Sequence, residues 1–372
     1  MSTLIEEQIE KIEKEIFDTQ KNKATEHHIG RLKAKIAKLR DSLQKEKSSK
    51  KGGGKGFAVK KSGDATVGIV GFPSVGKSTL LNKITTGTST VGNYDFTTLD
   101  VIPGMMNHMG AKIQILDLPG LIDGASNGRG RGKEILSAVR NVDLILLMIG
   151  STSGKNQIDI MKKELHNAGI RLNEHKPDII IKKKNQGGIT VNKTLKLTHL
   201  NDNVAKAVIS EYVINADVTI REDVNEDRLI DFLSKNRIYV PAIVVLNKID
   251  LINSQDVLEK TIDSLRTDNS FVVPISARIN MNLNELKNMI FESLNRIRVY
   301  LKPIDGKADY NEPLILKKEA TVQDTCRIIH RDFTNKFKHA FIWGKSAKYN
   351  GQRVGLSHVL QDEDILTIVT KN

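Results

Sequence analysis

Residues 71 to 78 read Gly-Phe-Pro-Ser-Val-Gly-Lys-Ser, the spacing G-x-x-x-x-G-K-S of a phosphate-binding loop. The apolar residues Val67, Ile69 and Val70 precede it like a short buried strand, and residues 78–84 follow with helical spacing. A strand, a glycine turn and a helix N-terminus together aim several backbone N–H groups and the positive end of a helix dipole at one anion. The sequence therefore predicts an α/β domain that binds a nucleoside triphosphate.

The residue types inside the loop suit this chemistry. Gly71 and Gly76 let the backbone close around phosphate without a Cβ in the way. Lys77 supplies a point charge to the β and γ phosphates, and the Ser78 hydroxyl is placed to ligate Mg²⁺. ATPases and GTPases share this arrangement, so other residues must show whether the bound nucleotide carries adenine or guanine.

A second strand leads to a candidate metal residue. Residues 113–116 are apolar and run into Asp117-Leu118-Pro119-Gly120. This order puts a carboxylate at a strand end near the metal, where it would hold Mg²⁺ through water, and a flexible glycine near the γ-phosphate.

The base is indicated by Asn247-Lys248-Ile249-Asp250, which follows a core strand centred on residues 243–246. A carboxylate at Asp250 can accept from the ring N–H and the exocyclic amine of guanine, whereas adenine offers no such pair of donors. Asp250 thus argues against an ATPase, which stays a distant alternative. Ser276-Ala277, after a strand at residues 271–275, is expected to close over the base.

A further switch element is expected at Tyr94-Asp95-Phe96-Thr97-Thr98-Leu99, directly after the turn-forming Gly92-Asn93. One of its two threonine hydroxyls should complete the Mg²⁺ shell when the γ-phosphate is present.

At this point the chain resembles a known family. Phe-Thr-Thr-Leu followed by Pro103-Gly104, Asp-Leu-Pro-Gly-Leu-Ile at 117–122 and the glycine-rich stretch 124–132 are similar to the developmentally regulated GTP-binding (DRG) proteins, within the wider Obg-type GTPases. The resemblance covers nearly the whole chain. It implies that Thr98 is the metal ligand, and it implies a basic helical N-terminus, an insert in the G domain and a C-terminal TGS domain of ubiquitin-like β-grasp form.

Three overlapping sets of site residues follow. The predicted metal ligands are Ser78, Thr98 and Asp117, and the predicted catalytic residues are Lys77, Thr98 and Gly120. The predicted nucleotide contacts are Gly71, Phe72, Pro73, Ser74, Val75, Gly76, Lys77, Ser78, Thr79, Asp117, Gly120, Asn247, Lys248, Asp250, Ser276 and Ala277. The expected cofactors are GTP or GDP and Mg²⁺.

Hydrolysis itself should be slow without help. Leu121 stands where Ras-like proteins have the glutamine that orients the attacking water, and an apolar side chain cannot do this. Arg129 and Arg131 fit either of two roles: an arginine finger that reaches the γ-phosphate, or contacts to a partner. Some relatives use an asparagine at the fourth loop position to help bind an activating K⁺; this chain has Ser74, so K⁺ is an open question that turnover in KCl and NaCl would answer.

Composition agrees with an intracellular multidomain protein. The chain has 372 residues with 39% apolar content, enough for two or three cores. A single cysteine, Cys326, excludes an internal disulfide framework. The charged first residues lack the apolar stretch of a signal peptide, and no apolar run approaches the roughly 20 residues that span a bilayer. We expect a cytoplasmic protein without membrane contact.

Positive charge is concentrated near the N-terminus. Residues 27–61 hold 12 Lys and Arg against 2 Asp and Glu, which accounts for ten of the chain's thirteen net positive charges. Isoleucines and leucines at spacings of three and four from Ile5 to Ile16 and from Ile29 to Leu43 predict a helical hairpin joined near Gly30. Lys50 to Gly56 read as a flexible basic linker. We interpret this charge as a contact to ribosome or RNA; a solvated helix face is the alternative.

The remaining segments are read coarsely. Strands are expected at 179–181 and 188–191 and helices at 204–212 and 228–233, with Lys182 to Lys184 in a solvated turn. A helix is expected at 283–297, then a strand at 314–316, a helix near 322–333 and a strand at 365–369. Trp343, the only tryptophan, is expected in the core, with a partner-binding platform as the alternative.

The predicted fold class is α/β: a P-loop GTPase domain with an N-terminal helical hairpin, an inserted α/β unit and a C-terminal β-grasp (TGS) domain. The expected boundaries are 1–61 for the hairpin and linker, 62–297 for the G domain with its insert at about 170–235, and 298–372 for the TGS domain. The leading hypothesis is a Mg²⁺-dependent GTPase that acts as a ribosome- or RNA-associated switch in translation, with an activating protein partner a further candidate. The alternative is a nucleotide-responsive adaptor for a protein partner, in which hydrolysis is incidental.

Overall fold

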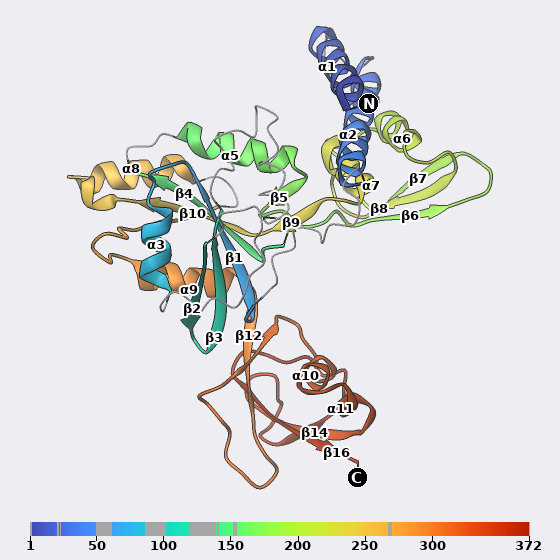
Figure 1. Ribbon diagram of the computed structural model, residues 1–372. Helices are drawn as coiled ribbons and strands as arrows, with labels where there is room; N and C mark the ends of the chain where they lie inside the picture. Colours follow the sequence, from blue (N-terminus) through green and yellow to red (C-terminus); the bar gives the residue numbers. More distant parts are fainter. Residues whose placement is uncertain are drawn as a thin grey trace. The chain divides into compact units, whose positions relative to one another are not determined.

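The computed structural model describes residues 2–20, 22, 24–49, 62–85, 102–118, 139, 141–151, 155–266 and 270–371. The chain divides into two compact units (Figure 1). Residues 1–56 and 169–239 form the first unit, and residues 57–168 and 240–372 form the second.

The described part of the second unit contains a six-stranded sheet. Its strands are β1 (Ala65–Gly71), β2 (Ile102–His108), β3 (Ala111–Asp117), β4 (Leu144–Gly150), β10 (Ala242–Asn247) and β11 (Phe271–Pro274). Their order is β11-β10-β4-β1-β3-β2, with β2 antiparallel at one edge and the others parallel. β1, β4 and β10 are buried along their whole length, as expected for apolar strands of a parallel sheet covered on both faces. The strands predicted at 67–70, 113–116 and 243–246 are confirmed.

Helices follow the strands of this sheet. They are α3 (Lys77–Ile84), α5 (Lys155–Asn167), the 3₁₀ turn η1 (Ile249–Leu251), α8 (Gln255–Leu265) and α9 (Leu283–Ser293). The helix predicted at 283–297 is therefore wrong at its end. Asn295 takes a left-handed backbone with φ 49°, which stops a helix, and a strand begins at Arg296.

Residues 296–370 fold around a five-stranded sheet of their own. Its strands are β12 (Arg296–Leu301), β13 (Leu314–Lys317), β14 (Phe337–Trp343), β15 (Gln352–Val354) and β16 (Asp364–Thr370), in the order β13-β12-β16-β14-β15. The helices α10 (Val322–Ile329) and α11 (Arg331–Asn335) accompany it (Figure 1). Thr321 and Asp324 close a capping box at the start of α10, which fixes where this helix begins.

An ion pair ties β12 to the turn before β16. Arg298 Nη2 lies 2.7 Å from Asp362 Oδ2, and the Arg298 backbone N–H also donates to Asp362. Burial alone would raise the pKa of the Asp362 carboxyl, but the hydrogen bonds and charge of Arg298 outweigh it and hold that pKa below its usual range. The ionised carboxylate therefore stabilises this sheet.

The core position predicted for Trp343 is wrong. In β14, Ala340 and Ile342 belong to the buried cluster, so the alternate residue Trp343 faces the other side of the sheet and is only half-buried. The ammonium of Lys302 lies 4.4 Å from the centre of its ring.

The first unit contains the predicted helical hairpin, made of α1 (Ser2–Asp18) and α2 (Glu26–Ser49). Its joint is residues 19–25, where the Asn22 side chain accepts from the N–H groups of Ala24 and Thr25, and not Gly30. Gly30 lies buried inside α2, where a Cβ would come within 3.0 Å of Val204 Cγ1. The glycine thus serves close packing rather than a turn.

The insert supplies the rest of this unit. Its elements are β5 (Ile170–Leu172), β6 (Ile179–Lys183), β7 (Ile189–Lys193), α6 (Asp202–Ser210), β8 (Ala216–Ile220), α7 (Glu226–Ser234) and β9 (Ile238–Val240). The predicted strands and helices are present, but Lys182 and Lys183 belong to β6 rather than to a turn. The sequence reading missed β8, the central strand of the order β6-β8-β7.

Figure 1 shows α6 and α7 beside α2, and Ala34 and Ala37 of α2 share a core with both helices. Cations of α2 are paired within this unit. The pairs are Arg31 with Glu211 at 2.6 Å, Lys33 with Glu226, and Arg40 with Glu13 at 2.7 Å. Three of the twelve Lys and Arg residues of the basic stretch 27–61 therefore pair with carboxylates of the same unit.

A buried ion network also reaches α2. Arg171 and Asp231 are 5% and 6% exposed, and Arg171 Nη2 donates to Asp231 Oδ1 at 2.6 Å. Arg237 links Asp231 at 2.9 Å to Asp41 at 3.1 Å. Such a network is expensive to break, because each removed partner leaves a buried opposite charge. It joins the hairpin to the insert as one folded body.

Candidate functional site

The site lies at the carboxyl ends of the parallel strands, where α/β sheets commonly bind ligands. β1 ends at Gly71, and a Cβ there would lie 2.4 Å from the Met148 carbonyl oxygen, so this position requires glycine. Ser74 and Gly76 have φ of 62° and 100°, which turns the loop back on itself before α3. Gly76 is the N-cap of α3 and makes no side-chain cap, so the first N–H groups of the helix remain available to an anion.

Lys77 points back across the loop. Its ammonium donates to the carbonyl oxygens of Gly71 and Phe72, each at 3.0 Å. An ammonium has three donors, so this arrangement holds the charge at the loop while leaving a donor for a phosphate oxygen.

Ser78, in the first turn of α3, meets Asp117 at the end of β3. The Ser78 hydroxyl donates to Asp117 Oδ2 at 2.9 Å. Asp117 is 4% exposed, and its Oδ1 atom is buried without a hydrogen-bond partner among the described residues. A buried carboxylate oxygen lacking a partner is costly in isolation, and it suits a water molecule held by Mg²⁺, which prefers oxygen ligands. The residues present therefore fit the magnesium ion expected from the sequence.

The other end of the site carries Asp250, in η1 after β10. Its Oδ1 accepts from the Ser276 hydroxyl at 2.6 Å, and Ser276 itself is fully buried. This bond orients the carboxylate and leaves Oδ2 to a ligand. Ala277, also buried, donates its N–H to Asn247 Oδ1 at 3.0 Å, which links the two loops.

Asn247 and Lys248 brace the phosphate loop from outside, a role that the sequence reading did not assign. Asn247 Nδ2 donates to the Val75 carbonyl at 2.9 Å, and Lys248 Nζ donates to the Ser74 carbonyl at 2.7 Å. The second bond holds the residue with the left-handed backbone. The polar pair Asn247-Lys248 at a strand end is the sequence signal for this role. The spacing of residues does not show that the pair contacts the carbonyls of Ser74 and Val75.

The structure thus gathers most of the predicted residues around one loop. Val75 is buried under it, whereas Pro73, Ser74, Ser78 and Thr79 are exposed to solvent. Thr98 and Gly120 lie outside the described residues, as do Leu121, Arg129 and Arg131. Anion donors at one end and an oriented carboxylate at the other are what a phosphorylated guanine nucleoside requires.

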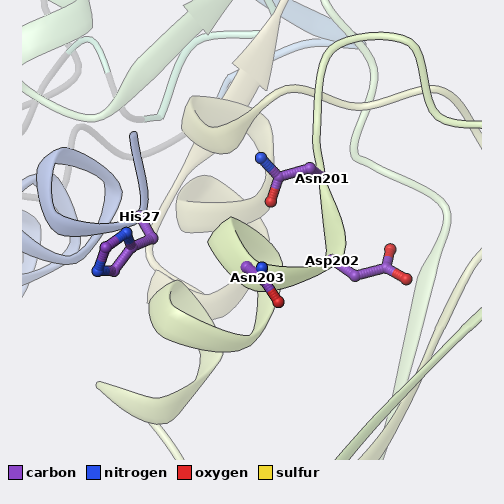
Figure 2. Close-up of a pocket in the computed structure, with 4 residues that line it drawn as sticks. All are labelled: His27, Asn201, Asp202 and Asn203. Carbon is purple, nitrogen blue, oxygen red and sulfur yellow. The ribbon is translucent and has the colours of Figure 1, made fainter. Parts of the chain in front are cut away.

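A separate hollow in the first unit has a volume of about 250 Å³ and is lined by His27, Asn201, Asp202 and Asn203 (Figure 2). Asn201 already caps α6 by accepting from the Val204 N–H at 2.9 Å. No phosphate loop opens into it, so we assign it no ligand. Within the described ranges, no three His, Cys, Asp or Glu side chains gather as a metal cluster, and no helix is long and apolar enough to cross a bilayer.

Three family models match the chain in succession. A model described as 50S ribosome-binding GTPase matches residues 66–184, and one for the C-terminal region of that domain matches residues 186–295. A TGS domain model matches residues 297–370. The expected combination of P-loop GTPase and TGS domain is therefore confirmed.

Full-length relatives are also similar. An uncharacterized GTP-binding protein of Methanocaldococcus jannaschii is 52% identical, over 99% of this chain and 93% of the relative. Developmentally-regulated GTP-binding protein 2 of Homo sapiens is 46% identical over 98% and 99% of the two chains. Ribosome-interacting GTPase 1 of Saccharomyces cerevisiae is 47% identical over both complete lengths, 100% of each.

Proposed function

Because this chain belongs to the family of developmentally regulated GTP-binding proteins, we propose that it hydrolyses GTP in a Mg²⁺-dependent reaction and acts as a ribosome- or RNA-associated switch in translation. The family makes the chain a GTP-binding protein of the GTPase class. Magnesium dependence, the switch and a cytoplasmic location belong to the proposal. We also keep the domain boundaries 1–61, 62–297 and 298–372 as part of it.

One observation carries the proposal: a single loop is contacted from both sides by groups of complementary chemistry. On one side, Ser78 donates to the buried Asp117. On the other side, Lys248, which precedes Asp250 by two residues, donates to the Ser74 carbonyl. The hydrogen-bond donors for phosphate, the carboxylate of Asp117 for the metal and the carboxylate of Asp250 for the base are thus held by one connected set of loops.

In the proposed reaction, Lys77 and the first N–H groups of α3 hold the phosphates and neutralise charge that develops on them. Ser78 and Asp117 are the described groups that would hold Mg²⁺, with Thr98 as the third ligand implied by the family. When bound, Mg²⁺ stabilises negative charge on the phosphate oxygens. Gly120 would approach the γ-phosphate through its N–H. Leu121 cannot orient water, so we expect slow turnover until a backbone group or a partner does so.

One observation favours the alternative in which the chain is an adaptor for a protein partner. Arg31, Lys33 and Arg40 pair with carboxylates of their own unit, so a phosphate would compete with these partners for the three cations. The name of the yeast relative supports the ribosome. We therefore propose that the hairpin fixes the first unit internally and that the polyanion contact draws on other cations, including those of residues 50–61.

Turnover of GTP by the purified full chain tests the catalytic half. We expect hydrolysis that needs Mg²⁺ and an Asp117→Asn variant that requires a higher Mg²⁺ concentration for half-maximal turnover. Asp143→Asn, at a strand end away from the phosphate loop, is the matched control. Turnover that persists in a chelator would refute the proposal.

A further inference from the structure

The hairpin of β2 and β3 joins the nucleotide site to the opposite end of the six-stranded sheet. The two strands pair along their whole length, from Ile102 opposite Asp117 to His108 opposite Ala111. Asp117 lies at the phosphate loop, where Ser78 donates to it at 2.9 Å. At about 3.4 Å per residue, the turn after His108 lies roughly 20 Å from that carboxylate. The hairpin thus spans the distance from the proposed metal site to its own turn.

This turn contacts the domain formed by residues 296–370. Met109 and Gly110 both have left-handed backbones, with φ of 50° and 79°, as a tight two-residue hairpin turn requires. A Cβ on Gly110 would lie 2.3 Å from Cγ of Pro313, the residue before β13. The backbone of the turn and the proline ring are therefore in direct contact, and this position has no room for a side chain.

A second contact is made two residues further along β13. Leu314 and Leu316 enter the core of their own sheet, whereas Ile315 points the other way and packs against the core of the six-stranded sheet. On β12, opposite Ile315, the guanidinium of Arg298 lies 5.9 Å from the centre of the Phe291 ring in α9. β13 therefore docks on the GTPase domain through an apolar side chain, next to the hairpin turn.

β2 also has close neighbours inside the GTPase domain. His108 Nε2 lies 2.8 Å from Asn288 Oδ1 of α9. A Cβ on Gly104 would lie 2.5 Å from Cγ2 of Thr85, the residue that ends α3, and α3 begins at the phosphate loop. Because packed interiors transmit strain, a shift of the hairpin at the nucleotide alters the packing at its turn.

We propose that this hairpin couples the bound nucleotide to the docking of β13, so that GTP tightens the contacts of Pro313 and Ile315 and GDP loosens them. The inference rests on the proposed function, since GTP with Mg²⁺ would hold both ends of the hairpin. One end is Asp117, and the other is Thr98, four residues before β2 and outside the described residues. A hairpin held at both ends is already ordered, so β13 docks on it at a lower cost in conformational entropy.

Coupling of this kind is reciprocal. If GTP tightens the docking of β13, then the docking of β13 raises the affinity for GTP over GDP by the same factor, about fivefold or more. A contact that only supports the fold would change neither quantity.

Hydrogen exchange of the full chain in Mg²⁺ tests the first direction. Amides of β13 should exchange about fivefold or more slowly with a non-hydrolysable GTP analogue than with GDP. β15, the opposite edge strand of the same sheet, is the internal control and should exchange alike in the two states. Equal exchange of β13 with the two nucleotides would overturn the inference.

Two variants test the reverse direction. Ile315→Ala shortens the side chain that packs against the GTPase domain, and Pro313→Ala removes ring atoms at Gly110. Each should lower the affinity for the analogue relative to GDP, by up to the factor seen in hydrogen exchange, in competition against fluorescent GDP. Ile328→Ala, the same substitution at an exposed position of α10, should leave that ratio unchanged. Variants that weaken both nucleotides equally, or neither, would contradict the coupling.

The outcomes separate this inference from the proposed function. A chain that hydrolyses GTP with Mg²⁺, but whose β13 exchanges equally with GDP and the analogue, refutes the coupling only. A chain whose β13 responds to the analogue, but that does not turn over GTP, refutes the proposed hydrolysis only, because the coupling requires GTP and Mg²⁺ to bind and not to react.

Discussion

Asp250→Asn should exchange guanine for xanthine as the preferred base. Guanine offers two donors, its ring N–H and its exocyclic amine, whereas xanthine replaces the amine by a carbonyl acceptor. In the structure Ser276 donates to Asp250 Oδ1, so an asparagine at this position keeps its oxygen there and puts its amide nitrogen in place of Oδ2. That nitrogen can donate to xanthine but opposes the amine of guanine.

The magnitude follows from the bonds that change. The variant replaces one charged acceptor, Oδ2, by a donor, and a hydrogen bond to a charged group is worth roughly 1.5–3 kcal/mol, so the Kd for GTP should rise by roughly one to two orders of magnitude. The Kd for XTP should fall below that for GTP in the variant. Competition of each unlabelled nucleotide against fluorescent GDP or XDP measures both constants.

Ser276→Ala is the matched control for orientation. It keeps the carboxylate but removes the bond that holds it, so both GTP and GDP should bind less tightly without any gain for XTP. The reasoning is refuted if Asp250→Asn keeps the wild-type ratio of GTP to XTP affinity, or if the wild type binds ATP as tightly as GTP.

Other perturbations give equally definite expectations. Lys248→Met removes the charged hydrogen bond that holds Ser74, so GTP and GDP should lose affinity by a similar factor, about tenfold or more, in a direct binding assay; an effect confined to the triphosphate would contradict this. Asp231→Asn takes the carboxylate away from two buried guanidiniums and should destabilise the first unit by about 3–5 kcal/mol, seen as faster hydrogen exchange in α7. Glu211→Gln, at a pair with an exposed arginine, should cost less than about 1 kcal/mol, and equal effects of the two would refute the distinction. The pKa of Asp362 is depressed in the fold, so its contribution to stability is present above the ordinary carboxyl pKa of about 3.9 and is lost as pH falls through the folded value. Asp362→Asn should therefore lower the melting temperature followed by tryptophan fluorescence at pH 7, with a gap that narrows below about pH 4; a constant gap would contradict it.

The residues of the phosphate loop could be predicted because their chemistry is local. Gly71, Gly76 and Lys77 stand at fixed offsets on one strand, one turn and one helix, and these elements formed as expected. The meeting of Ser78 with Asp117 could be expected only from the rule that parallel strands end at one edge. The contact of Lys248 with Ser74 could not be read at all, because it joins segments far apart in the chain.

The errors lie where packing overrides local preference. Glycine weakens helices, which favours a joint near Gly30, but in the structure its missing side chain admits Val204 at close range inside α2. The apolar spacing of residues 283–297 continued past the true helix end, because Ile297 is buried in the next strand rather than in the helix. Local periodicity does not reveal which core a side chain enters.

The ion-pair partners of the α2 cations could not be predicted from the local sequence either. A run of cations in a sequence carries no record of the acids that will face it, and Glu211 and Glu226 lie far along the chain in the insert. Trp343 is the opposite case, since a tryptophan in an apolar strand is usually placed in the core, yet strand alternation puts it on the outer face beside Lys302.

Co-sedimentation of the full chain with ribosomes, with GDP or a non-hydrolysable GTP analogue and at several salt concentrations, tests the switch most directly. The account predicts binding that weakens with salt, is stronger with the analogue than with GDP, and loses this difference in Asp250→Asn. Binding that ignores the nucleotide, or no binding at all, would contradict it.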